Sequence, residues 1–132
     1  MSHHDAIKKF VQVTLGCGCP EEVFRFIDCK NNVSVAVDAI ADRVITIGNR
    51  LLIYVLEAAA DGAVRSRLAE FVTAGKNERD SKGFNRFRLV VVLDDTTEQN
   101  KIAKVFEALP DKDEKVHLHM ISSEESLFPS KT

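Results

Sequence analysis

The chain has 132 residues, of which 45% are hydrophobic and 29% are charged. This length and apolar content predict one folded domain over residues 1–132, and they exclude a disordered tail, a collagen-like repeat and a two-domain enzyme. Eighteen basic and twenty acidic side chains give a formal net charge of −2, so no basic excess indicates binding to nucleic acid or to a membrane surface.

The first part of the chain predicts a strand, a helix and a second strand. Residues 8–15 alternate between apolar and polar side chains, which is typical of a strand. Pro20 suits the first position of a helix, and apolar residues at helical spacing extend that helix over residues 20–28. The polar run 30–32 then interrupts it, and alternating valines predict a strand over residues 33–37.

Residues 43–56 predict a β-hairpin. Two apolar runs flank Gly48 and Asn49, and glycine at the first central position suits a type II′ turn. The second arm, residues 51–56, has no polar alternation, which is typical of a strand buried on both faces. We therefore expect this arm to lie inside the sheet, covered by helices.

The next element is an amphipathic helix over residues 61–74, because apolar side chains recur there at i, i+4, i+7 and i+8. Gly75 is a plausible helix end. Residues 76–83 are charged and lack periodicity, so we expect them to form a surface loop.

The last part predicts a strand, a helix and a strand. Residues 87–93 form an almost continuous apolar run, and Thr96 with Gln99 matches the capping-box pattern at a helix start. Pro110 ends that helix, and alternation over residues 116–120 indicates a final strand.

Together these elements predict an α/β fold, a single-domain mixed sheet of about six strands in the order βαβββαβαβ with helices packed on it. The final strand–helix–strand–helix–strand unit requires parallel strands joined by right-handed crossovers. Residues 1–7 and 122–132 are expected to be flexible ends.

One short segment suggests chemistry. Cys17, Gly18 and Cys19 lie between the first strand and Pro20, which places Cys19 at the predicted helix N-cap, where the helix dipole lowers a thiol pKa. In thiol redox exchange Cys19 would be the attacking thiolate and Cys17 the resolving thiol. The same two sulfurs could instead ligate zinc or an iron–sulfur cluster with ligands from elsewhere.

The third cysteine, Cys29, falls at the far end of the predicted helix, roughly 15 Å from Cys19 at about 1.5 Å per residue, so we expect it to be structural. Three cysteines without a secretory signal predict a reducing, cytoplasmic location and no disulfide framework. The apolar runs are strand-sized, so no membrane span is expected.

Acidic residues suggest a second site. Glu57 ends one buried strand, and Asp94 and Asp95 end another, so the three carboxylates are expected at one edge of a parallel sheet, where they could hold magnesium. This spacing resembles the glutamate and aspartate arrangement of Toprim-type domains. The resemblance implies magnesium-dependent phosphotransfer, with these three residues as metal ligands. The alternative is that Asp95 or Thr96 caps the following helix and Glu57 is a solvated strand end.

Two pairs of basic residues lie on the last two strands. His117 and His119 project to one face, a spacing that can place two imidazoles on one metal, although a solvated edge strand explains it more simply. Arg86 and Arg88 flank Phe87 and are likewise expected on a solvated face.

The sequence therefore leaves three hypotheses. The first is thiol redox exchange or metal binding at Cys17 and Cys19, with a thiol substrate or a protein partner. The second is a non-catalytic interaction or regulatory domain in which these cysteines only shape a turn. The third is the phosphotransfer domain. Whether the protein is an enzyme, and its oligomeric state, are left open.

Overall fold

The structure is a computed structural model. It describes residues 27–36, 39–48, 50–58, 62–110, 113 and 115–122. The expected strand over residues 8–15 and both cysteines of the Cys17–Cys19 segment lie outside these residues, as do most positions of the helix expected over residues 20–28.

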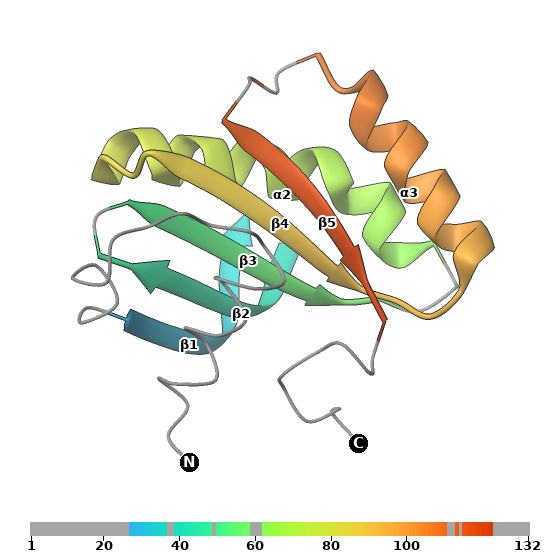
Figure 1. The fold of residues 1–132 in the computed structure, drawn as a ribbon, viewed down its shortest axis with the longest axis horizontal. Helices are drawn as coiled ribbons and strands as arrows, with labels where there is room; N and C mark the ends of the chain where they lie inside the picture. Colours follow the sequence, from blue (N-terminus) through green and yellow to red (C-terminus); the bar gives the residue numbers. More distant parts are fainter. Residues whose placement is uncertain are drawn as a thin grey trace.

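The described residues form one mixed sheet of five strands (Figure 1). The strands lie side by side in chain order, β1-β2-β3-β4-β5. The β1–β2 and β2–β3 pairs are antiparallel, whereas the β3–β4 and β4–β5 pairs are parallel. Their bounds are Ile27–Ala36, Ala39–Ile47, Leu51–Glu57, Arg86–Val92 and Val116–Ile121. The predicted α/β mixed sheet is therefore confirmed.

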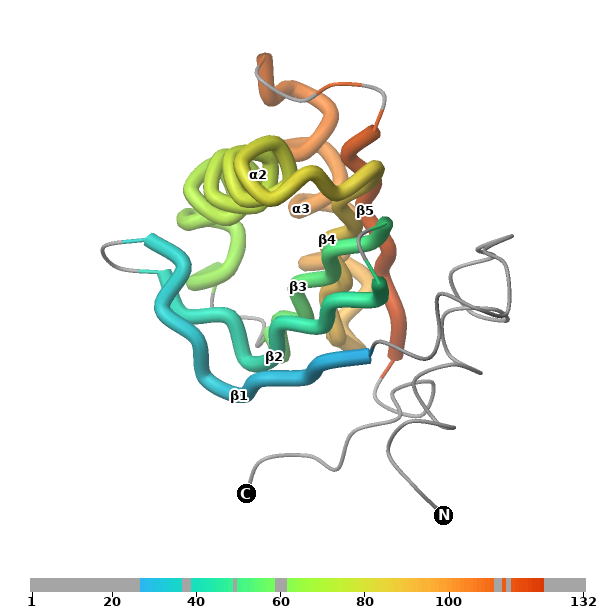
Figure 2. The backbone as a smooth tube through the Cα atoms, turned by 90° about the vertical axis from the view of Figure 1, so that its left-hand side faces the viewer, coloured from blue at the N-terminus to red at the C-terminus, as the bar shows by residue number. Residues whose placement is uncertain are grey.

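Two helices connect the parallel strands. Helix α2, Ala63–Lys82, joins β3 to β4, and helix α3, Thr96–Ala108, joins β4 to β5. Right-handed crossovers that step in the same direction across a sheet place their helices on the same face. Figures 1 and 2 show both helices on one side of the sheet, which we call the first face.

The sheet buries apolar side chains on both faces. Strand alternation sends Leu52, Tyr54 and Leu56 to the first face, where they pack with Leu68 and Ile102 of the helices. A separate apolar cluster occupies the opposite face, which we call the second face. Its buried members are Ile45, Ile47, Leu51, Ile53, Val55, Val90, Val92 and Ile121. Strand β3 is thus buried on both sides, as predicted, although α2 and α3 cover only the first.

Strand β1 begins earlier than predicted. It starts at Ile27 and continues through the polar residues 30–32, so residues 27 and 28 are strand rather than helix. Asn32 adopts φ 52°, and a register irregularity follows between Ser34 and Ala36. An edge strand accommodates polar residues and such distortions because only one of its sides is paired.

Helix α2 extends beyond its predicted end. It passes through Gly75 and ends at Gly83, whose φ of 77° suits the left-handed C-cap. Residues 76–82 are therefore helical, and the prediction of a loop over 76–83 is wrong. The charged side chains are retained in the helix because several form ion pairs, including Arg79 with Asp113 and Lys82 with Glu78.

The predicted antiparallel pairing of the two arms is confirmed as β2 and β3, but Ile47 pairs with Leu51, so the two-residue type II′ turn predicted at Gly48 and Asn49 is wrong. The three residues 48–50 connect the arms, Gly48 adopts φ 56°, and the Arg50 N–H donates to the Ile47 carbonyl over 3.2 Å. Glycine suits this position because it adopts a left-handed backbone without the steric cost that other residues incur.

Candidate functional site

Of the three cysteines, only Cys29 lies in the described part of the chain. It is on β1, opposite Ile45, and is partly buried with a free thiol. Burial raises the pKa of this thiol, although the nearby Arg43 guanidinium acts in the opposite direction. The prediction that Cys29 ends a helix is wrong, so the helical separation from Cys19 no longer applies.

Glu57 lies at the predicted carboxyl end of β3, in register with Val92 of β4. Its backbone N–H donates to Asp42 Oδ2 over 2.7 Å. Its carboxylate Oε2 is buried and has no hydrogen-bond partner. Asp42 is an acidic neighbour that the sequence did not reveal, because it reaches Glu57 through pairing of β2 with β3.

The two aspartates after β4 differ in their roles. Asp94 and Asp95 are both exposed. Asp95 is the N-cap of α3, and its Oδ1 accepts from the Glu98 N–H over 2.8 Å. Of the two predicted caps, Asp95 and Thr96, the structure has Asp95, and the capping-box partner Gln99 instead donates to the Leu93 carbonyl. Asp95 is therefore used for helix stability.

Within the described ranges, no three histidine, cysteine, aspartate or glutamate side chains form a group able to hold a metal ion. A magnesium site that includes Glu57, Asp94 and Asp95 would therefore need ligands from the rest of the chain. Zinc or iron–sulfur binding at Cys17 and Cys19 falls outside the described residues.

A basic cluster lies on the second face, on β4 and β5. Alternation along β4 places Arg86 and Arg88 on this face together with Val90 and Val92. On β5 it places His117 and His119 there with Ile121. The register pairs Arg88 with His117 and Val90 with His119. The four basic side chains therefore share one corner of the second face.

Arg88 is the central residue of this cluster. It is only 8% exposed. Its Nη1 lies 2.7 Å from Nε2 of His119, while its Nε is buried and has no partner. No carboxylate among the described residues bonds this guanidinium. Burial, followed by repulsion from Arg86, lowers the pKa of Arg88, which indicates that its charge lacks compensation.

The two histidines are held neutral near pH 7. Burial, repulsion from Arg88 and repulsion from His117 lower the pKa of His119 to about 4. Burial and the same arginine lower the pKa of His117, whose Nε2 is buried without a partner. Because arginine can only donate, His119 Nε2 must be the acceptor of this hydrogen bond. The neutral imidazole therefore carries its proton on Nδ1.

The expectation of a solvated face is wrong for Arg88, which is buried, whereas Arg86 is exposed and the two histidines are partly buried. The alternation in β5 was read correctly, and the histidines do share a face. Sequence periodicity, however, does not reveal whether a polar face is covered. An unbroken apolar run on the neighbouring β4, beginning directly after Arg88, is the signal that indicates burial there.

The cluster has the donors needed to bind an oxyanion. The Nε edge of a guanidinium forms two parallel hydrogen bonds to a carboxylate or phosphate, and this edge is unused in Arg88. His117 adds a nitrogen without a partner, on the adjacent strand. In a water-poor environment such charge-assisted bonds are stronger than at the surface.

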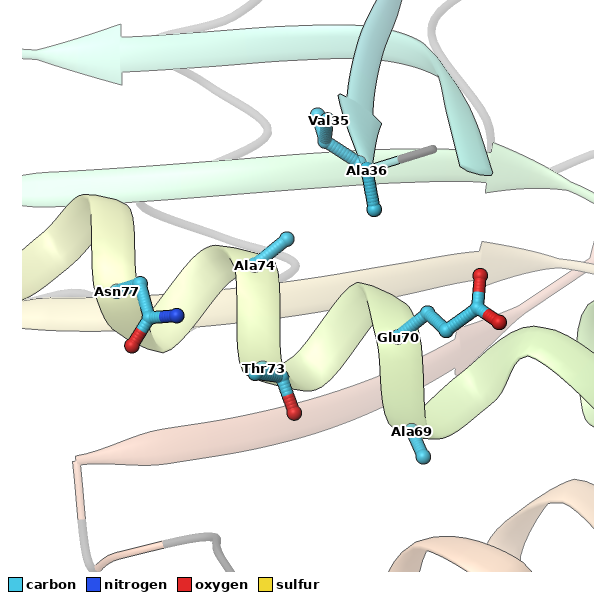
Figure 3. A pocket seen from close by; sticks show the side chains of 7 residues that line it. All are labelled: Val35, Ala36, Ala69, Glu70, Thr73, Ala74 and Asn77. Carbon is cyan, nitrogen blue, oxygen red and sulfur yellow. The ribbon is translucent and has the colours of Figure 1, made fainter. Parts of the chain in front are cut away.

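A groove lies elsewhere, between the end of β1 and helix α2 (Figure 3). Its volume is about 380 Å³, and it is lined by Val35, Ala36, Ala69, Glu70, Thr73, Ala74 and Asn77. Its one ionisable lining residue, Glu70, pairs with Arg67 over 3.2 Å. The groove therefore has few groups that could position a reaction.

No helix in the described part of the chain is both long enough and apolar enough to span a membrane. Comparisons of the chain with protein-family models, curated proteins and solved structures found no match.

Proposed function

We propose that this protein is a non-catalytic interaction or regulatory domain that binds an oxyanion, a carboxylate or a phosphate group, at Arg88, His117 and His119. The observation that carries the proposal is the buried Arg88 guanidinium, whose Nε has no partner and whose one hydrogen bond goes to a neutral imidazole.

The energetic argument concerns the cost of burying charge. Removing an ion from water costs roughly several kcal/mol of solvation free energy, and attraction to an opposite charge can offset that cost. Arg43, also buried on the second face, at least has the acceptor Asn31 Oδ1 at 2.7 Å. Arg88 has no oxygen acceptor among the described residues. An incoming oxyanion would supply the missing charge and the missing acceptors together.

The test uses calorimetric titration of the full chain with inorganic phosphate and with acetate at pH 7. We expect saturable binding of one or both anions, and comparing them identifies the preferred group. Arg88→Met should weaken binding by about tenfold or more, since a charge-assisted hydrogen bond contributes roughly 1.5–3 kcal/mol. Arg86→Gln, which changes an exposed arginine on the same strand, is the matched control and should bind nearly as well.

A stability measurement distinguishes a ligand-binding role of Arg88 from a structural role. If Arg88 serves a ligand, Arg88→Met should leave the free energy of unfolding unchanged or raise it, because an uncompensated buried charge is removed. Absence of saturable binding by the wild type, or equal binding by Arg88→Met, would show the proposal to be wrong. Arg88→Lys, which keeps the charge but loses the fork, provides a second variant.

For Cys17 and Cys19 we also propose thiol exchange, or zinc or iron–sulfur ligation, in a reducing compartment. The supporting observation is the position of both sulfurs within three residues directly before Pro20. A thiolate at a helix N-cap is stabilised by unsatisfied backbone N–H groups. This proposal is independent of the oxyanion site.

A further inference from the structure

Three exposed basic residues lie at the amino ends of the parallel strands. Arg50 directly precedes β3, Arg86 is the first residue of β4, and Lys115 directly precedes β5. Figure 1 shows that these three strands start at the same end of the sheet. The Arg50 carbonyl accepts from the Arg86 N–H over 3.1 Å. The Lys115 carbonyl accepts from the N–H of the next residue of β4, Phe87, over 3.0 Å. The three basic residues are therefore neighbours on adjacent strands, and we call them the basic rim.

The positive charge of the basic rim is not compensated by the described part of the chain. No carboxylate there forms an ion pair with Arg50, Arg86 or Lys115. Asp113, two residues before Lys115, binds Arg79 instead at 2.6 Å. The basic rim is thus a local excess of positive charge on a chain whose formal net charge is −2.

Acidic residues lie at the opposite end of the same strands. Glu57 is the last residue of β3, and its N–H donates to Asp42. Asp94 and Asp95 follow β4 and are exposed. The parallel part of the sheet therefore has one basic end and one acidic end. Such a separation of charge steers an anionic partner toward the basic end before contact.

We propose that the basic rim binds an acidic peptide segment of a partner protein, with one oxyanion of that segment at Arg88 and its neighbouring carboxylates at Arg86 and Lys115. The inference rests on the proposed oxyanion site for the position of the first anion. Arg86 and Arg88 are two residues apart on one strand, so about 7 Å separates their Cα atoms at roughly 3.4 Å per residue. An extended peptide covers a similar length in two residues. A peptide therefore reaches Arg86 even though a small anion at Arg88 does not require it.

The charge of Arg86 already acts on the proposed anion site. Besides burial, repulsion from Arg86 lowers the pKa of Arg88. The same arginine contributes, after burial and Arg88, to the lowered pKa of His117. A peptide carboxylate at Arg86 would relieve this repulsion, so anions at the rim and at Arg88 should favour each other's binding.

An acidic peptide fits the basic rim better than a nucleic acid or a membrane surface. Single-stranded nucleic acids bind by stacking their bases on aromatic side chains, but Phe84 and Phe87, on either side of Arg86 in the chain, pack in the first-face core. Recruitment to anionic lipids typically uses a cluster of roughly four to eight basic residues. Three exposed cations instead match a few carboxylates of one peptide.

The experiment compares two fluorescent peptides by anisotropy titration with the full chain at pH 7. Both contain one phosphoserine, followed by three glutamates in one peptide and by three glutamines in the other. We expect the glutamate peptide to bind about tenfold more tightly at low salt, because each exposed ion pair adds a modest increment. This ratio should approach one in about 0.5 M NaCl, where exposed charges are screened. Equal affinities at low salt would overturn the proposal, as would tighter binding of single-stranded RNA or of phosphatidylserine vesicles.

Variants assign the difference between the peptides to the basic rim. Arg86→Gln combined with Lys115→Gln should reduce the ratio of the two affinities to about twofold or less. The matched control, Lys101→Gln with Lys104→Gln, removes the same charge from exposed positions of α3 and should retain the ratio. Equal ratios in the two double variants would overturn the proposal.

Arg88→Met distinguishes this proposal from the oxyanion site on which it rests. The variant should weaken both peptides by a similar factor and leave their ratio unchanged, because Arg88 contacts the phosphate group that both contain. Unchanged affinities in Arg88→Met would overturn the oxyanion site. Loss of the ratio in the control variant on α3, with Arg88→Met still weakening both peptides, would overturn the basic rim alone.

Discussion

Gly75 of α2 lies directly against the ring of Phe87 on β4. A methyl group at this position would overlap the Phe87 ring, with its Cβ nearest to Cζ. The ring is fully buried and also meets Tyr54 edge-on, with centroids 4.8 Å apart. The absence of a side chain at Gly75 therefore allows the helix to approach the sheet over a large aromatic residue.

The first prediction follows from this contact. Gly75→Ala should destabilise the protein by about 1–3 kcal/mol, because the added methyl group overpacks a fixed ring. In an exposed helix the same change stabilises by about 1 kcal/mol, so the sign of the effect identifies the contact. Urea unfolding at pH 7 measures the difference.

The matched control is Asn77→Ala, at an exposed position of the same helix, which should leave stability nearly unchanged or raise it slightly. Gly75→Ala combined with Phe87→Leu should recover part of the loss, because the smaller side chain makes room. A stabilising effect of Gly75→Ala alone would contradict the close approach.

The glycine also shows why one helix was predicted too short. The sequence predicts a helix end at Gly75 because glycine is common at C-caps, but Gly75 instead allows close packing between α2 and β4. Local sequence cannot distinguish these roles, since Phe87 is twelve residues away. The strands and crossovers were predicted because period-2 and period-3.6 patterns are local properties.

The candidate site was predicted less well than the fold. The alternation of β5 placed His117 and His119 on one face, and this is confirmed. The contact between Arg88 and His119 depends on parallel pairing of strands 31 residues apart in sequence. Their burial further depends on what covers the face. Neither property is encoded in a local pattern, so a solvated face was predicted where the structure has a buried guanidinium.

The cap of α3 provides a second prediction. Asp95→Ala should destabilise the protein by about 0.5–2 kcal/mol, because the Glu98 N–H loses its acceptor at the helix N-terminus. Thr96→Ala, at the position favoured by the sequence pattern, should have little effect. Thermal unfolding of the two variants measures this difference. A larger loss for Thr96→Ala would indicate that the capping residue is Thr96.

A third prediction concerns the ion pair between Arg79 and Asp113. The guanidinium, 4% exposed, bonds both Asp113 oxygens at 2.8 and 2.6 Å. The hydrogen bonds from Arg79 lower the pKa of Asp113 from 3.8 to about 2. Asp113→Asn should lower the free energy of unfolding by about 1–2 kcal/mol at pH 7. This loss is smaller than that from breaking a fully buried ion pair, because the carboxylate is partly exposed.

The pH dependence of this loss has a definite sign. A depressed carboxyl pKa stabilises the folded chain above pH 3.8, and that contribution disappears as the pH falls toward 2. The stability difference between wild type and Asp113→Asn should therefore narrow over this range. Asp80→Asn, which removes the more exposed partner of Arg79, should have a smaller effect. A stability difference between wild type and Asp113→Asn that stays constant with pH would contradict the ion pair.

A fourth prediction concerns His119. Its folded pKa of about 4 lies below the ordinary value of 6.5, so in this interval the unfolded chain binds a proton that the folded chain does not. Stability should therefore fall as the pH decreases from 6.5 to 4. His119→Gln, which retains an acceptor for Arg88, should flatten this dependence. NMR titration of the imidazole should give the low pKa directly, and a pKa near 6.5 would contradict burial beside Arg88.

The last prediction compares cysteines within one chain. The N-cap position that the sequence predicts for Cys19 would lower the pKa of its thiol below the usual value of about 8.5, whereas burial raises the pKa of Cys29. Since the thiolate is the nucleophile, iodoacetamide at pH 7 should modify Cys19 faster than Cys29, as peptide mass spectrometry of a time course would show. Cys29→Ser leaves the fast reaction in place, while Cys17→Ser with Cys19→Ser removes it.

Metal analysis of protein purified without air distinguishes the two uses of the pair, because ligated sulfurs would be protected and accompanied by stoichiometric zinc or iron. Slow modification of Cys19 in metal-free protein would contradict both uses, because a functional pair must either react or hold a metal.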